Sequence, residues 1–162
     1  MAVDMFLKLD GIDGESQDDK HSKEVDLLSF TWGQTHDAAP GSTTVGAGSG
    51  VGKVSFSDFA VTFYSNKASA KVFSSCSGGK HIASAIITVR KSGDTPQEYL
   101  IITLTDVTVN SHNISCAQGG LSMETAALGF AKIEYAYSPQ KSDGSLDAAV
   151  KANYNIQKNK AE

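Results

Sequence analysis

Apolar and polar residues alternate along most of this chain with the period of two that is typical of β-strands. The first such run covers residues 3–9, and its apolar positions are Val3, Met5, Leu7 and Leu9. Further strand patterns cover residues 25–34, 54–64, 82–91, 98–110, 121–138 and 149–157. Because residues 121–138 hold one or two strands, we expect seven or eight in total, separated by turns. This number indicates an all-β sandwich or barrel.

The strand predicted over residues 25–34 has two different faces. Alternation places Leu28, Phe30 and Trp32 on one face. Ser29, Thr31 and Gly33 fall on the other. We expect the apolar face to lie in the core, which leaves the small polar face outside it.

One segment breaks the strand pattern and predicts a short helix over residues 66–77. Four of its side chains share one helical face: Ala68, Val72, Phe73 and Cys76. Ser65 or Asn66 can cap the start of this helix, and Gly78-Gly79 can end it. We therefore expect an antiparallel β-barrel with one helix packed against it.

Residues 34–52 form a long glycine-rich segment between two predicted strands. A loop of this length inside a compact domain is uncommon unless it is functional or disordered. We favour an arm that becomes ordered against a partner, and plain disorder remains the alternative. The segment ends in a pattern resembling a phosphate-binding loop, but Val54 follows Lys53 where that loop needs Ser or Thr, and a strand follows where it needs a helix.

Composition narrows the class of protein. The 162 residues and 17.0 kDa are typical of one domain, residues 1–162, and 40% of the residues are hydrophobic. The net charge is −4, and among the 14 basic residues Arg90 is the only arginine. Nucleic-acid binding is therefore not expected. The apolar runs, such as residues 99–102, are too short to insert into a membrane.

No group of residues carries a catalytic, cofactor or metal-binding pattern. The four histidines are scattered, and the acidic residues between Asp10 and Asp19 lack the ligand spacing of a calcium loop. We expect that acidic segment to form a solvated hairpin and its turn. The two cysteines, Cys76 and Cys116, do not fit a zinc pattern and are interpreted as buried thiols. The sequence therefore predicts no enzyme and no cofactor.

Several segments, in their order along the chain, resemble the haemolysin-coregulated protein family, the tube subunits of bacterial type VI secretion systems. They are Met5-Phe6-Leu7-Lys8-Leu9-Asp10-Gly11-Ile12 with Gly14-Glu15-Ser16; His21 with Glu24; Ser29-Phe30-Thr31-Trp32-Gly33; the glycine-rich loop into Gly52-Lys53-Val54; Cys76 with Gly79-Lys80-His81-Ile82; Glu98-Tyr99-Leu100 with Ile102-Thr103-Leu104; and Phe130-Ala131-Lys132-Ile133 with Tyr137-Ser138-Pro139-Gln140. One departure lies in the last strand, where Tyr154 stands at a position that is often Trp in the family. We expect Tyr154 to substitute in packing.

The resemblance implies a barrel of two antiparallel sheets with one flanking helix, assembled as a homohexameric ring. In the family, rings stack into a hollow tube inside a contractile sheath, capped by a valine–glycine-repeat spike. The lumen of some members shelters small effector proteins. The tube is made in the cytoplasm and secreted without a cleavable signal, which agrees with Asp4, Lys8 and Asp10 interrupting the apolar N-terminal run.

The resemblance also suggests roles for individual residues. Ser29 and Thr31 are predicted to line the lumen and contact effectors. The predicted subunit or ring interface comprises Gly46, Gly48, Gly50, Gly52 and Lys53. The alternative is a monomeric β-barrel that binds a small ligand in its interior.

Overall fold

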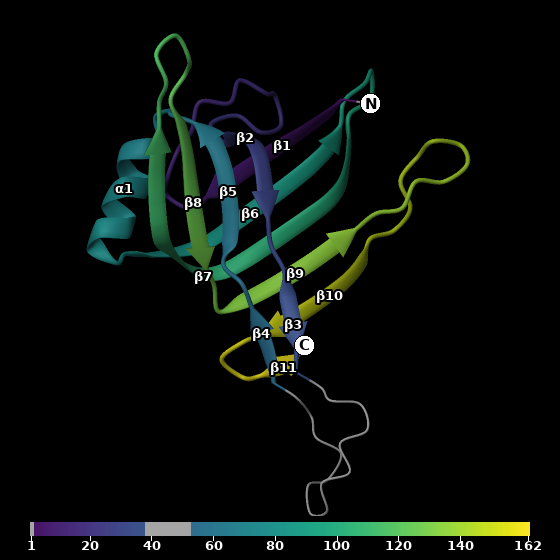
Figure 1. Ribbon diagram of the computed structural model, residues 1–162. Helices are drawn as coiled ribbons and strands as arrows, with labels where there is room; N and C mark the ends of the chain where they lie inside the picture. Colours follow the sequence, from purple (N-terminus) through teal and green to yellow (C-terminus); the bar gives the residue numbers. More distant parts are fainter. Residues whose placement is uncertain (1, 38–52) are drawn as a thin grey trace, which may run out of the picture.

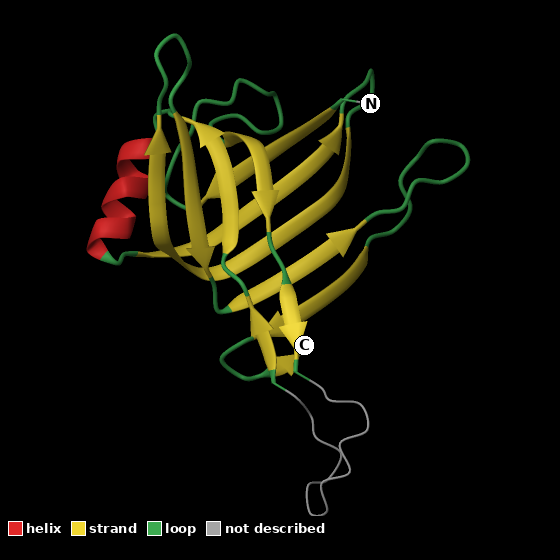
Figure 2. Ribbon diagram, in the orientation of Figure 1, coloured by secondary structure: helices red, strands yellow, loops and turns green. Residues whose placement is uncertain are grey.

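The structure is a computed structural model that describes residues 2–37 and 53–162 (Figure 1). Its elements are β1 (Val3–Leu9), β2 (Val25–Thr31), β3 (Gln34–His36), β4 (Val54–Phe56), β5 (Phe59–Tyr64), α1 (Ser69–Gly78), β6 (His81–Lys91), β7 (Gln97–Ser115), β8 (Met123–Gly129), β9 (Lys132–Tyr137), β10 (Val150–Asn155) and β11 (Lys160–Ala161). The expected class is confirmed: the chain is mostly β, with one helix against one side of a barrel (Figure 2).

Six antiparallel strands close the barrel in the order β7-β6-β1-β2-β5-β8, and pairing of β8 with β7 completes the ring of strands. The alternation predicted for β1 explains how the interior forms, because Leu7 and Leu9 are buried there. Large side chains from other strands, including Phe59, Phe63 and Leu104, are fully buried in the same core. The barrel interior is therefore filled by side chains.

β7 and the consecutive strands β8 and β9 form one long hairpin whose halves belong to different parts of the molecule. The first half of β7 pairs with β9, ending at Thr105 opposite Lys132. The second half pairs with β8, starting at Thr108 opposite Gly129. Figure 1 shows the hairpin turning a corner between the two halves. β8 goes on to pair with β5 and closes the barrel, whereas β9 pairs with β10 outside it. We call β9 and β10 the platform.

The helix lies within one to three residues of its predicted bounds. It spans Ser69–Gly78 rather than 66–77, because Asn66 forms a turn before it: the Asn66 Oδ1 atom accepts a hydrogen bond from the Ala68 amide at 2.8 Å. Ala68 rather than Ser65 or Asn66 occupies the N-cap position. At the other end Gly79 adopts a left-handed conformation with φ of 62°, which suits glycine.

Two predicted strands are divided by short irregular segments. Residues 25–34 split into β2 and the start of β3, and residues 54–64 split into β4 and β5. The segment 34–52 is therefore not irregular from its start, since β3 (Gln34–His36) pairs with β4 in a small hairpin. The Ser57 hydroxyl fastens this hairpin to the barrel, because it accepts from the Gly33 amide and donates to the Gly33 carbonyl, both at 3.0 Å.

The loop between β1 and β2 is anchored by an ionic network and is not simply solvated as expected. Arg90 is buried on β6 and binds both carboxylate oxygens of Asp18, at 3.0 and 2.6 Å. It also donates to Asp4 at 3.2 Å and lies over the ring of Phe6. Hydrogen bonds from Arg90 hold the pKa of Asp18 well below its usual range. His21 is also buried and stacks on Phe6, so the loop covers the outside of β1 and β6.

Candidate functional site

Ser29 and Thr31 lie exposed on the outer face of β2, where the small polar face was predicted. The strand registers align each of them with neighbours on β5, β8 and β7. One row is Thr31, Ala60, Ala127 and Ser111, and the next is Ser29, Thr62, Thr125 and Asn113. We call these two rows the hydroxyl face.

The hydroxyl face consists of small side chains on neighbouring strands of the barrel wall. None of its side chains is charged, and the Thr62 and Thr125 hydroxyls lie 3.4 Å apart across β5 and β8. An acidic group borders it: both oxygens of Asp58 accept from the Asn110 amide at 3.1 Å. The face can therefore offer hydroxyl and amide hydrogen bonds to a partner without imposing a charge on it.

A β-bulge that the sequence pattern did not predict lies at Leu28, immediately before Ser29. Leu27 pairs with Phe63, but Ser29 pairs with Thr62, so Leu28 is left outside the regular ladder. Leu27 is consequently buried and Leu28 is 40% exposed. The prediction that Leu28 belongs to the core was wrong. Phe30 and Trp32, in contrast, do pack against the core.

The platform carries an apolar surface that the other described elements cover only in part. Its strands continue the barrel's inner face, because Leu104 lies opposite Ile133 and Ile102 lies opposite Tyr135. Ile133 is still buried, but Tyr135 is 40% exposed and Val150, farther out, is 67% exposed. The apolar side of the platform comprises Ile133, Tyr135, Tyr137, Val150, Ala152 and Tyr154. Contiguous apolar surface of this kind marks interaction sites in soluble proteins.

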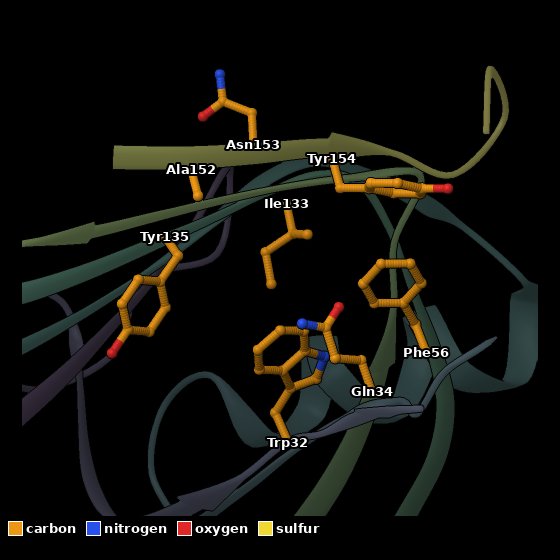
Figure 3. Close-up of a pocket in the computed structure, with 8 residues that line it drawn as sticks. All are labelled: Trp32, Gln34, Phe56, Ile133, Tyr135, Ala152, Asn153 and Tyr154. Atoms are coloured by element: carbon orange, nitrogen blue, oxygen red, sulfur yellow. The ribbon is translucent and has the colours of Figure 1, made fainter. Parts of the chain in front are cut away.

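An aromatic cleft of about 390 Å³ lies where the β3–β4 hairpin faces the platform (Figure 3). Figure 3 shows Trp32 and Phe56 on one side of it, with Tyr135 and Tyr154 on the platform side. The rings of Phe56 and Tyr154 lie 5.0 Å apart, centre to centre. The Tyr154 hydroxyl donates to Asn159 Oδ1 at 2.7 Å. Tyr154 thus has the packing role expected for it in the last strand.

The predicted interface residues lie mostly beyond the described chain. Gly46, Gly48, Gly50 and Gly52 fall outside the described residues. Lys53 is described: it is exposed, and its carbonyl accepts from the Asp37 amide at 3.4 Å, next to the β3–β4 hairpin. Lys53 therefore lies beyond the His36–Val54 end of the β3–β4 hairpin, away from the Gln34–Phe56 end that lines the aromatic cleft, and apart from Ser29 and Thr31 on β2.

The titratable side chains form pairs that tie elements together. His112 contacts the buried Glu124 at 2.7 Å, and His81 contacts Asp106 at 2.6 Å. Burial opposes ionisation of Glu124, but hydrogen bonds from Ser65, His112 and Ser69 outweigh it and lower its pKa. Within residues 2–37 and 53–162, no group of three or more His, Cys, Asp or Glu residues could hold a metal ion.

The prediction that both cysteines are buried was wrong for Cys116. Cys76 is partly buried against the core from α1, but Cys116 is exposed at the turn between β7 and β8. Its strand ends before this turn, so no neighbouring element covers the thiol. In the part of the chain that the structure describes, no helix has the length and apolar character needed to cross a membrane.

The platform is the candidate interaction surface that sequence reasoning missed. The sequence does show an apolar face here, because Ile133, Tyr135 and Tyr137 alternate with other residues along β9 as core residues do. Alternation identifies an apolar face but does not show whether another strand or helix covers it. Only the strand order reveals that β9 and β10 lie outside the closed barrel.

The chain is similar in sequence and in fold to known proteins. A family model described as "Type VI secretion system effector, Hcp" matches residues 6–137. Protein hcp1 of Pseudomonas aeruginosa is 41% identical over 162 residues, which cover 98% of each chain. Among solved structures, a type six secretion system protein has a TM-score of 0.91 and 29% identity, covering 99% of this chain and 100% of that chain. Hcp1 of Salmonella typhimurium has a TM-score of 0.79 and 35% identity over 100% of both chains.

Proposed function

The chain belongs to the haemolysin-coregulated protein (Hcp) family and is a type VI secretion system tube subunit, and we propose that six copies of it close into a ring whose channel is lined by the hydroxyl face. Family membership supports tube assembly by self-association. A ring forms when one patch of each copy binds a different patch on the next and the rotation closes. The closed rings then stack into the tube.

The observation that carries this proposal is that one protomer has two surfaces of opposite character. The apolar face of the platform is partly uncovered, and its residues Tyr137 and Val150 are exposed. The hydroxyl face has no charge and no large apolar side chain. An apolar face favours a permanent partner that excludes water, so we assign the platform to the neighbouring subunit. A small polar face tolerates water, so we assign the hydroxyl face to the channel.

We assign the segment that follows β3 to a second contact between subunits or rings. Gln34 and Phe56 of the β3–β4 hairpin line the aromatic cleft, and Lys53 directly precedes β4. Gly46, Gly48, Gly50 and Gly52, with Lys53, are proposed to contact the adjacent copy. Glycine permits close approach of two backbones, which supports this role.

Small effector proteins are the proposed occupants of the channel, with Thr31 and Ser29 as their contacts. Their hydroxyls offer hydrogen bonds without a charge that would select one effector by its net charge. The contractile sheath is proposed to surround the tube, and the valine–glycine-repeat spike to cap it. The family is one of structural, secreted tube proteins. We propose that this chain is held in the cytoplasm until firing and has no enzymatic activity.

A channel-lining role for Thr31 can be tested with Thr31→Gln, which adds bulk to the hydroxyl face. We expect rings of wild-type mass that retain a co-expressed effector at least tenfold less well, since one bulky side chain per copy narrows the channel six times over. Thr95→Gln is the matched control, because Thr95 is exposed on the loop between β6 and β7. Equal retention by the two variants would remove Thr31 from the proposed site.

The small-ligand alternative finds no support in the described part of the chain. Ile87, Leu104 and Phe59 are fully buried inside the barrel, where such a ligand would have to lie. The aromatic cleft lies outside the barrel, between the β3–β4 hairpin and the platform (Figure 3). Its position supports a contact with another copy rather than an interior ligand site.

A further inference from the structure

The corner of the long hairpin coincides with an unusual backbone conformation. Asp106 has a φ of 55°, in the left-handed region that non-glycine residues seldom adopt. It lies between the last β7–β9 pair, at Thr105, and the first β7–β8 pair, at Thr108. On the facing segment, the Ala131 amide donates to the Thr105 carbonyl at 3.0 Å, so β9 remains attached up to the corner. The change of direction is thus concentrated at Asp106.

His81 holds the Asp106 side chain in place. Its Nδ1 atom lies 2.6 Å from Asp106 Oδ1, and it is the first residue of β6, immediately after the turn that ends α1. The two side chains are 65% and 45% exposed. Because they lie at the surface, they add little to core packing. The bond instead links the start of one barrel strand to the bend of the next.

The two surfaces of the proposed ring meet at this corner. The barrel half of the hairpin carries part of the hydroxyl face, including Ser111 and Thr125. The other half carries the platform through β9. The backbone angle at Asp106 therefore sets the direction of the platform relative to the proposed channel lining. An angular error in each subunit adds up around a ring, so closure requires this angle to be well defined.

We propose that His81 and Asp106 are positioning residues for self-association, which hold the platform at the angle that ring closure needs. This inference rests on the proposed assembly of the ring. Asp is among the residues that tolerate the left-handed region, and its carboxylate accepts the hydrogen bond that fixes the bend. Asn offers the same tolerance and an oxygen acceptor, whereas Gly offers the conformation without the bond.

The experiment compares Asp106→Gly, His81→Ala and Asp106→Asn with the wild type. Light scattering over a concentration series gives the half-assembly concentration of each protein. We expect Asp106→Gly and His81→Ala to raise it about fivefold, the effect of one lost hydrogen bond of ordinary strength, and Asp106→Asn, which keeps an oxygen acceptor, to stay near the wild type. Asp94→Gly makes the same change on an exposed loop and serves as the control.

A second measurement reports directly on the bend of the hairpin at Asp106. Spin labels at position 111 on β7 and position 151 on β10, in a background with Cys76 and Cys116 replaced, report the distance between barrel and platform. Asp106→Gly should broaden that distance distribution and Asp94→Gly should not. Wild-type association by both Asp106→Gly and His81→Ala, or an unchanged distribution, would overturn the inference. A wild type that stays monomeric would instead refute the proposed ring, and the distance distribution alone would then decide whether the pair sets the angle.

Discussion

The two halves of the β7–β8–β9 hairpin have the same alternating pattern and opposite environments. In the barrel half, Ala126 and Leu128 on β8 point inward and are buried. In the platform half, Tyr135 and Tyr137 continue along the same chain and are 40% and 43% exposed. The difference lies in what faces each half, because β5 and the rest of the barrel enclose the first, whereas β10 alone pairs beyond the second.

This difference suggests that the barrel half determines the folding stability of the protomer, whereas the platform half determines its association with other copies. A sheet that closes on itself buries its apolar side and has no free edge. A sheet that leaves the barrel keeps its apolar side available for a second copy. Changes in the barrel half should therefore reduce folding stability, and changes in the platform should reduce association.

Phe63→Ala should have the largest effect, because Phe63 on β5 is 1% exposed in the barrel core. We expect the free energy of unfolding to fall by about 3–5 kcal/mol, through lost burial and the cavity left behind. Chemical denaturation of the wild type and the variant measures it. Tyr135→Ala on the platform is the comparison, and an equal loss in both variants would contradict the separate roles of the barrel and the platform.

The double substitution Tyr137→Ser and Val150→Ser should weaken association without unfolding the protomer. Both side chains lie opposite each other at the outer end of the platform, and Val150 is 67% exposed. Loss of two apolar contacts per interface should raise the half-assembly concentration by roughly tenfold or more, measured by light scattering.

Phe73→Ser is the matched control for the platform variant. Phe73 is 60% exposed on α1, on the opposite side of the molecule from the platform in Figure 1. The Phe73→Ser variant should have the same half-assembly concentration as the wild type. If the α1 variant weakened association as much as the platform variant did, the assignment of the platform to the subunit interface would fail.

Gly129→Ala should disturb the border of the hydroxyl face. A Cβ atom at Gly129 would lie 2.6 Å from Asn110 Nδ2 and 2.9 Å from Thr108 Oγ1. Asn110 would have to move away from Asp58, with a loss of about 1 kcal/mol of unfolding free energy by denaturation. Gly93→Ala meets nothing within 4 Å and should cost less. A variant at position 129 as stable as the wild type would show that the Asn110–Asp58 contact adds nothing.

The smallest effect concerns acid stability in the barrel half. The lowered pKa of Glu124 means that its contribution is fully present above the unfolded-state value and is lost as the pH falls through the folded-state value. Glu124→Gln should therefore lose less stability than the wild type between pH 6 and pH 3, as measured by thermal unfolding across that range. The Glu124→Gln variant should still lose some stability at low pH, because the pKa of Asp18 is lowered too. An equal fall in melting temperature between pH 6 and pH 3 in the two proteins would contradict a role for Glu124.

Residue patterns predicted the barrel because alternation and turn residues are local properties. They placed Ser29 and Thr31 on a polar face correctly, although the bulge at Leu28 shifted the core residues on the same strand. A bulge depends on pairing with β5, which alternation within β2 does not encode. The platform and the His81–Asp106 corner depend on contacts between residues far apart along the chain. They became visible only once the strand order was known.

Further copies of the chain should cover the exposed apolar part of the platform by closing into a ring. Light scattering on a sizing column at micromolar concentration, with negative-stain images of the same peak, tests it most directly. We predict a mass of about six times that of the 17.0 kDa chain, with annular particles. A monomer at every concentration would contradict it.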